Sequence, residues 1–485
     1  MERGTAVEDP EHLKDFRVGS PWLFWQQKRY VLAFLVFLAN VNMYTMRTNL
    51  SISIVAMTQN RMNLLENGTV ENLGPEFAWS NIAQGYLLSA FFYGYVCTPL
   101  LGGWLSKKYG GKLLFGGCLL GSAIVSLLGP WLARWSFYAF LVGRVCVGLL
   151  EGLAHSSNYY LWSHWIPPVE RTKITSLSLS GNYVGNVFSM VFFGFLVQRT
   201  GWKSSFWCSG FLSIIWFLFF WWLVSETPAT HPSISKTELN YIQTSINRPE
   251  NAKINGPVPW KLMLTSMSIW AYMMVSFCET WGYFTLMTLL PKYFKDVFKI
   301  DLFQSGILSA LPYVCMFFMM SIAGVTADIV IRKQWLSPTN TRKSFIAVGF
   351  ITQAVFMRAA ANWGTVMGTV FCLVIAIGAS SLAISSISVQ PLDLAPNNAS
   401  IVMGLCQTAT CITGVLSPTI AGYIVSTENP RPEEWQTVFY IAAGTYLVGL
   451  IFYFIFGKGD MERWDLIAKD DNKSCSTFIF KSENH

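Results

Sequence analysis

Charged residues are scarce in this sequence. Asp, Glu, Lys and Arg make up 13% of its 485 residues, whereas about 25% is usual in a soluble domain. The charges that are present lie between apolar runs of roughly 20 residues, the length at which a helix crosses a bilayer. The sequence therefore predicts a multi-pass protein embedded in membrane lipid. Its net charge of +7 is explained by basic residues at the ends of spans, so we expect no nucleic-acid partner.

Motifs for catalysis and metal binding are also missing. None of the ten cysteines has CxxC spacing, and the sequence contains no HExxH, no Gly-x-Ser-x-Gly and no paired acidic metal motif. These absences argue against a disulfide framework, a metal site, a cofactor and an enzyme.

Twelve apolar runs divide into two sets of six, separated by a long polar segment. We place the spans at about 30–57, 83–104, 113–133, 137–162, 174–197 and 206–224, and then at about 267–290, 305–328, 344–362, 365–387, 400–424 and 437–457. Two six-helix halves with a substrate site between them are typical of a major facilitator. The predicted fold is an all-α membrane protein with a major facilitator fold of 12 transmembrane helices. Its parts would be a cytoplasmic tail at 1–29, the halves at 30–224 and 263–457, a cytoplasmic central loop at 225–262, and a cytoplasmic tail at 458–485.

An internal repeat supports the division into halves. The segment Gly102-Gly-Trp-Leu-Ser-Lys-Lys-Tyr-Gly-Gly-Lys112 is echoed by Gly324-Val-Thr-Ala-Asp-Ile-Val-Ile-Arg-Lys333. Both segments place glycine before a bend and basic residues after it. Most basic loop residues fall on one side of the membrane if the N-terminus is cytoplasmic, which favours both termini inside.

Two local signals lie in the polar segments. Ser235-Lys-Thr-Glu238 has the form of a capping box, with Ile234 and Leu239 placed as a hydrophobic staple, and predicts a short helix on the membrane surface. Asn67-Gly-Thr69 is a glycosylation acceptor, expected on the non-cytoplasmic side.

A polar stripe interrupts the fourth span. Arg144, Glu151 and His155 are separated by seven and then four residues, which places them on one face of a helix with about 3.6 residues per turn. A charge at the centre of a bilayer costs roughly 2.5–3.5 kcal/mol on insertion scales. We therefore expect this face to line a central cavity rather than to contact lipid.

Five blocks of the sequence are distinctive: Ser89-Ala-Phe-Phe-Tyr-Gly-Tyr95 with the glycine-rich turn that follows, Trp162-Ser-His-Trp-Ile-Pro-Pro-Val-Glu-Arg171, Met287-Thr-Leu-Leu-Pro-Lys-Tyr293, Gln390-Pro-Leu-Asp-Leu-Ala-Pro396 and Glu434-Trp-Gln-Thr-Val-Phe-Tyr-Ile-Ala-Ala443. They resemble one family of carriers, the anion/cation symporters of solute carrier family 17. This family contains sialin, the vesicular glutamate transporters and the type I sodium–phosphate cotransporters. The resemblance covers residues 25–465 and is nearest to the sialin-like branch.

The resemblance places a substrate-binding arginine at Arg47 in the first span. A guanidinium stays charged and offers a fork that fits carboxylate or phosphate. Tyr44, one turn earlier, could add a hydroxyl contact. The alternatives are a structural arginine paired with Glu151, and plain aromatic packing for Tyr44.

The resemblance also links Glu151 to proton coupling. Burial disfavours the charged form of a carboxyl group and a nearby arginine favours it, so the two effects compete. A permanent ion pair with Arg144 or Arg47 is the alternative. Arg144 and His155 complete the candidate coupling group, although we expect Arg144 to be a structural partner and His155 to be a packing histidine rather than a relay.

Three positions depart from the pattern of the relatives. Val147 stands where relatives commonly carry an acidic or amide residue, and Tyr159 stands where they carry a histidine. Glu279 aligns with an arginine that, in the vesicular glutamate transporters, holds the second carboxylate of the substrate. This reversal of charge argues against a dicarboxylate. Glu279 and Tyr283 join Arg47 and Tyr44 as candidate substrate-binding residues, with a cation site or a pair with Arg47 as alternatives for Glu279.

The expected function is secondary active transport of an organic anion or inorganic phosphate by alternating access, coupled to H⁺ or Na⁺. A carrier-fold sensor or scaffold without flux, and a carrier for a zwitterionic or cationic substrate, remain alternatives. We expect a monomer whose partners are a small anionic solute and membrane lipid. Its membrane would be the plasma membrane or an endolysosomal or vesicular membrane.

Overall fold

The structure is a computed structural model that describes residues 25–58, 60–64, 70–246, 258–300, 302–425, 431–462 and 464–465. The predicted glycosylation site at Asn67 and most of the two predicted tails lie outside the described residues.

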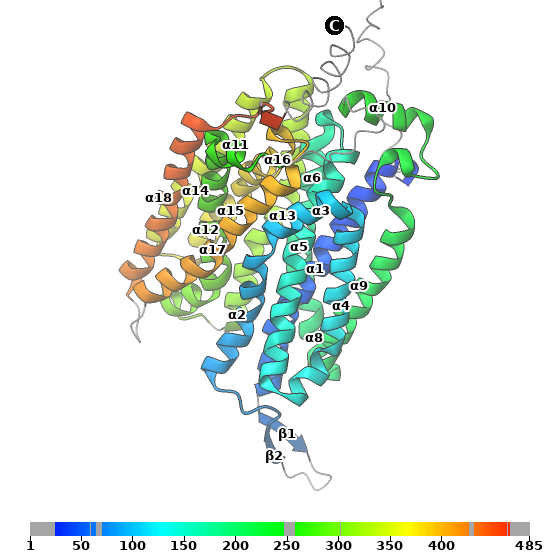
Figure 1. Cartoon of the computed structure of the whole chain (residues 1–485). Helices are drawn as coiled ribbons and strands as arrows, with labels where there is room; N and C mark the ends of the chain where they lie inside the picture. Colours follow the sequence, from blue (N-terminus) through cyan, green and yellow to red (C-terminus); the bar gives the residue numbers. More distant parts are fainter. Residues whose placement is uncertain are drawn as a thin grey trace, which may run out of the picture.

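The first half of the chain is a bundle of helices, drawn from blue to green on the right of Figure 1. Its elements are α1 (Lys28–Thr58), α2 (Asn81–Cys97), α3 (Pro99–Tyr109), α4 (Gly111–Trp135), α5 (Phe137–Trp165), the 3₁₀ helix η3 (Pro168–Glu170), α6 (Arg171–Leu179), α7 (Gly181–Phe188), the π-helix η4 (Ser189–Phe193), α8 (Gly194–Thr200) and α9 (Lys203–Leu223). η3 to α8 form one continuous segment, which replaces the single helix expected for the fifth span.

The second half repeats this arrangement and lies on the left of Figure 1. It is reached through η5 (Pro228–Thr230), α10 (Lys236–Ile246) and α11 (Trp260–Thr265). Its helices are α12 (Met267–Phe298), α13 (Leu302–Arg332), α14 (Pro338–Asn362), α15 (Val366–Ile387), α16 (Gln390–Leu394), α17 (Ala399–Ile424) and α18 (Pro432–Phe456).

Ten helical segments of the described chain are long and apolar enough to cross a membrane. The two other predicted spans are present as α2 with α3, and as α12. The second span was predicted as one helix, but it breaks between α2 and α3 at Thr98 and Pro99, because proline lacks an N–H donor and its ring clashes with the preceding turn. α12 is 32 residues long and is less apolar because it carries Glu279 and neighbouring polar residues.

Buried apolar side chains form a separate core in each half. The larger core consists almost entirely of residues from 263 to 464. A second core is built mainly from residues between 32 and 242, with a few from the other half. This division supports the prediction of two bundles, each with its own packed interior.

The polar segment after α1 contains two strands that the sequence did not predict. β1 (Asn60–Leu64) and β2 (Val70–Pro75) pair antiparallel, with Leu64 opposite Val70 and a register shift near Asn60. They lie at the lower end of the bundle in Figure 1. The strands are short and rich in polar residues, so their sequence pattern is weak.

The predicted capping box at the start of α10 is only half formed. The Ser235 hydroxyl accepts a hydrogen bond from the Glu238 backbone N–H at 3.1 Å. The Glu238 carboxylate instead accepts from the backbone N–H groups of Lys28 at 3.0 Å and Arg29 at 3.2 Å, at the start of α1. A carboxylate at a helix N-terminus is favourable because the N–H groups there have no partner within the helix.

Polar contacts join the two halves at the end of the bundle that carries α6 and α16, at the top of Figure 1. Asp393 pairs with Arg171 at 3.2 Å and with Arg342 at 3.0 Å. Arg342 also donates to the Thr172 hydroxyl at 2.8 Å. Both arginines are buried, and they share the single Asp393 carboxylate, which thereby joins a positive charge from each half.

The internal repeat lies at this same end. In the second copy, the Asp328 carboxylate accepts from the backbone N–H groups of Thr172 at 3.2 Å and Lys173 at 2.7 Å, at the N-terminus of α6. In the first copy, the Gly103 carbonyl accepts from the Ser400 hydroxyl at 2.9 Å, and a Cβ at Gly103 would collide with the Ser400 backbone. Each copy of the repeat therefore contacts the opposite half, and together these contacts close one end of the bundle.

We predict that Asp393→Asn weakens this closed end. The change leaves two buried guanidinium groups without their carboxylate, and breaking a buried pair costs about 3–5 kcal/mol. Opening at this end should become more frequent, and a membrane-impermeant maleimide applied from this side of vesicles should label Cys411 about ten-fold faster or more. Labelling is followed by mass spectrometry of the Cys411 peptide.

Glu433→Gln is the matched control, because Glu433 is an exposed acid at the opposite end of the bundle, in the first turn of α18. Equal labelling rates in the two variants, together with equal thermal stability, would show that Asp393 does not hold the halves together.

Candidate functional site

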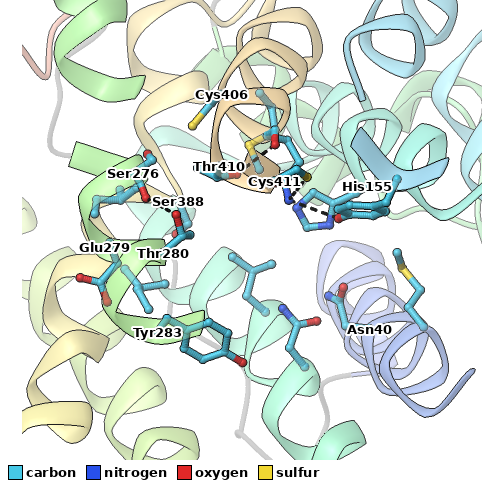
Figure 2. Close-up of a pocket in the computed structure, with 18 of the residues that line it drawn as sticks. Asn40, His155, Ser276, Glu279, Thr280, Tyr283, Ser388, Cys406, Thr410 and Cys411 are labelled. Atoms are coloured by element: carbon cyan, nitrogen blue, oxygen red, sulfur yellow. Dashed lines mark hydrogen bonds between the residues drawn. The ribbon is translucent and has the colours of Figure 1, made fainter. Parts of the chain in front are cut away.

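A cavity of about 180 Å³ lies between the two halves. Its lining comes from α1, α2, α5, α6 and α7 on one side, and from α12, α15, α17 and the α15–α16 turn on the other. Figure 2 shows Asn40 and His155 facing Ser276, Thr280, Tyr283 and Ser388 across it, with Glu279 farther out at the left edge of the view. Polar groups placed sparsely in a mainly apolar lining are typical of a site for a small molecule.

Six of the seven predicted site residues line this cavity. They are Tyr44, Arg47, Glu151, His155, Glu279 and Tyr283. Arg144 lies elsewhere.

Arg47 projects from the middle of α1 and is surrounded by aromatic rings. Its guanidinium carbon lies 4.5 Å from the ring centroid of Phe92, 4.8 Å from that of Phe91 and 5.4 Å from that of Tyr44. Ring faces are negative and attract a cation. Within the described residues, the guanidinium makes no hydrogen bond and no ion pair within 4.0 Å. Its donors therefore remain available.

Glu151 is 2% exposed, and its side chain reaches the cavity from α5. Its Oε1 atom is buried and has no hydrogen-bond partner among the described residues. Arg47 and Arg144 are close enough to act on it electrostatically, but neither forms an ion pair with it within 4.0 Å in this part of the chain. The predicted alternative of a permanent pair is thus not formed in this conformation.

Arg144 ties α5 to α1 instead of entering the cavity. It donates to the backbone carbonyls of Met46 at 3.1 Å and Arg47 at 3.0 Å, and to the Asn49 side-chain oxygen at 3.4 Å. Arg144 is on the same face as Glu151, but seven residues displace it by about 10 Å along the helix axis. The stripe therefore extends beyond the cavity, and Arg144 fixes the backbone that carries Arg47.

His155 is partly buried on the cavity wall, with its ring 6.3 Å from that of Tyr159. Figure 2 shows it on the same side of the cavity as Asn40. Its roles as a packing residue or a relay both stay predictions.

The opposite wall carries a second carboxylate. Glu279 of α12 is 4% exposed, and its Oε2 atom accepts a hydrogen bond from the Gln353 amide at 3.1 Å. Tyr283, one turn later, packs its ring against Tyr183 and Tyr313 with centroid distances of 6.4 and 6.0 Å. Tyr44 and Tyr283 interact across the interface of the halves. The predicted pair between Glu279 and Arg47 is not formed among the described residues.

Sequence reasoning missed the contribution of α17. Gln407, Thr410 and Cys411 line the cavity from this helix, and the Gln407 amide donates to the Tyr95 hydroxyl of the other half at 3.3 Å. The signal was their spacing of three and four residues in an apolar span, which places them on one helix face. Asn182 and Tyr159 were also missed as lining residues, and each has a buried oxygen with no hydrogen-bond partner in the described chain.

Comparison with known proteins identifies the family. A model of the Major Facilitator Superfamily matches residues 32–418. Human sialin is 35% identical over 453 residues, which span 90% of this chain and 91% of sialin. Human vesicular glutamate transporter 2 is 34% identical over 488 residues, which span 99% of this chain and 82% of that protein. The chain belongs to solute carrier family 17 of the major facilitator superfamily.

The fold of this family 17 carrier also matches a solved structure. The proton:xylose symporter XylE superimposes with a TM-score of 0.67 at 13% identity, over 89% of this chain and 97% of that one. The predicted multi-pass membrane protein with a major facilitator fold is therefore confirmed. The nearly equal identities to sialin and to the glutamate transporter do not separate the two branches.

Close packing of α2 on α5 positions both Arg47 and Glu151 in this family 17 carrier. A Cβ at Gly148 would collide with the Phe91 carbonyl oxygen, and a Cβ at Gly94 would collide with that of Val145. Glu151 follows Gly148 by less than one turn, and the Phe91 ring lies under Arg47. Only glycine lets the two backbones come this close.

We predict that Gly148→Ala forces α2 and α5 apart and lowers stability by about 1–3 kcal/mol, the usual cost of overpacking. The measurement is the unfolding temperature of the purified protein, with the yield of folded material. Gly117→Ala in α4 is the control, because a Cβ there meets nothing within 4 Å. A loss of the same size in both variants would contradict this account.

Proposed function

We propose that this family 17 carrier is a secondary active transporter of a small organic anion or inorganic phosphate. The observation that carries the proposal is Arg47, a permanent cation in a cavity between two bundles that makes no ion pair within 4.0 Å in the described residues. A relative named as a vesicular glutamate transporter supports an anionic solute. Coupling to H⁺ is favoured over Na⁺ by the state of Glu151.

Arg47 would bind the anionic group of the substrate. A guanidinium presents donors in a planar fork that matches carboxylate and phosphate. The rings of Phe91, Phe92 and Tyr44 compensate its positive charge only in part, because a cation–π contact contributes about 0.5–2 kcal/mol. An anion that enters the cavity therefore forms a charge-assisted contact with Arg47 and compensates the positive charge that the rings leave uncompensated.

Glu151 would carry the coupling proton. A buried carboxylate that accepts no hydrogen bond is more stable when it is neutral, so Glu151 would hold a proton in this conformation. Of the two arginines that favour the charged form of Glu151, Arg47 has the larger effect. When an anion neutralises Arg47, the arginine stabilises the ionised form of Glu151 less. Glu151 therefore binds its proton more tightly. Anion and proton would then be loaded together, as in a symporter.

Transport would proceed by alternating access. The contacts of Asp393 and Asp328 hold one end of the bundle closed in this conformation. They all join one half to the other, so rocking of the halves can break them without unfolding either core. The end they close carries Lys107, Lys112 and Lys173, and by the positive-inside rule we assign it to the cytoplasm.

We predict that Arg47→Ala lowers anion uptake into reconstituted vesicles about 100-fold or more, because it removes a charge-assisted contact worth about 1.5–3 kcal/mol per hydrogen bond. The probes are radiolabelled phosphate, sialate, glucuronate and urate, with and without Na⁺. Arg358→Ala is the control, because Arg358 is exposed near the end of α14. Uptake that survives in Arg47→Ala would refute the assignment. Binding without counterflow in the unmodified protein would identify a non-transporting sensor instead.

We predict that Glu151→Gln removes the pH dependence of uptake and retains exchange of one anion for another. The amide mimics the neutral acid and cannot release a proton. In the unmodified protein, uptake should fall as the pH on the loading side rises. His155→Gln, next to it on the cavity wall, should keep this pH profile. A Glu151→Gln variant with an unchanged profile would remove Glu151 from the coupling step.

A further inference from the structure

Glu279 is a buried acid that the anion-transport mechanism does not use. It lines the cavity from the C-terminal half, and Gln353 is its hydrogen-bond partner at 3.1 Å. No Lys, Arg or His within the described residues pairs with it within 4.0 Å. Its Oε1 atom accepts no hydrogen bond from the same residues. A charged carboxylate is costly away from water unless a cation or several donors compensate it.

Tyrosine side chains surround this acid. Tyr183 and Tyr446 lie within electrostatic range of the Glu279 carboxylate. The Tyr446 hydroxyl packs directly against Gly282, on the turn of α12 that follows Glu279. Tyr283 and Tyr313 are neighbours in the same cluster, with ring centroids 6.0 Å apart. A carboxylate among aromatic faces is suited to an ammonium group, because both attract a cation.

The two ends of the cavity therefore have opposite chemistry. The N-terminal half presents Arg47 on aromatic rings of α2, and the C-terminal half presents Glu279 with no cation nearby. A substrate that is only anionic has no group that could compensate the ionised form of Glu279. A substrate with an ammonium group at one end and an acidic group at the other would neutralise both.

We propose that Glu279 forms a cation-recognising subsite, so that the transported solute is a zwitterion that carries an organic ammonium group as well as a carboxylate or phosphate. This inference rests on the proposed function, since it assigns the acidic group of the solute to Arg47. The zwitterion would contact both halves simultaneously. Glu279 would thus determine specificity, because an ammonium group bound beside it favours the ionised form of its carboxyl.

The test compares matched pairs of probes that differ only in an amine. Glycine, β-alanine, γ-aminobutyrate and phosphoethanolamine are paired with acetate, propionate, butyrate and ethyl phosphate. Each is measured as inhibitor and as counterflow substrate with the full-length protein in vesicles. We expect at least one amine-bearing probe to be preferred over its partner by about ten- to a hundred-fold, the range set by hydrogen bonds to charged groups.

Glu279→Gln should abolish that preference, because the amide keeps the size of the side chain but not its charge. Glu279→Asp should retain part of it. Glu433→Gln is the control for the same chemical change, made in the first turn of α18 and away from the cavity lining. Folding of each variant is checked by its unfolding temperature.

Three results would contradict the assignment of Glu279 as a cation-recognising subsite. The unmodified protein could treat both members of every pair alike, Glu279→Gln could keep the amine preference, or Glu279→Gln could shift the pH or Na⁺ dependence of all probes equally without changing that preference. The last result would make Glu279 a site for the coupling ion. Failure of the proposed function is distinct, because uptake would then be insensitive to Arg47→Ala whichever probe is used.

Discussion

The cost of placing a charge away from water governs how this carrier is built. Each ionised side chain in the bundle has to be compensated, and the charged residues achieve this to different degrees. Arg144 donates to backbone and amide oxygens of α1. Arg47 lies on aromatic rings without a carboxylate partner, and Glu151 has a buried oxygen that accepts no hydrogen bond among the described residues. Arg144 is held by several protein oxygens, whereas Arg47 and Glu151 on the cavity wall keep donors and an acceptor available for a ligand, which is the property that a binding site requires.

The same constraint explains how one end of the bundle closes. Asp393 serves a guanidinium from each half, and Asp328 places its carboxylate on the exposed N–H groups at the start of α6. Helix N-termini are good partners for carboxylates because their N–H groups have none within the helix. Such contacts are strong while they are dry, and water can replace them once the halves separate. They therefore suit an interface that has to form and break repeatedly.

Sequence pattern predicted the parts of the fold that depend on local composition. Long apolar runs indicated the spans. Polar residues at helical spacing indicated Arg144, Glu151 and His155 as cavity residues, of which Glu151 and His155 line the cavity. Arg47 was indicated by the family resemblance. The sequence pattern was less informative where the partner of a side chain lies far away along the chain. Glu238 was expected to cap its own helix, but its carboxylate binds the start of α1, 210 residues away along the chain. Gln407 was overlooked although Thr410 and Cys411 share its helix face, because spacing alone does not say whether a face meets a cavity or another helix.

The sequence by itself determined the membrane setting, the two bundles and the family, because these follow from apolar length, repetition and blocks of neighbouring residues. Only the tertiary structure decided which charges meet. Arg144 and Glu151 share a helix face, yet one bonds to α1 and the other reaches the cavity, because their distance along the helix axis separates them. The sequence left several roles open for Glu279, and only the structure showed that Gln353 and the tyrosines of three other helices surround it. Such contacts depend on how the helices pack, which no local pattern encodes.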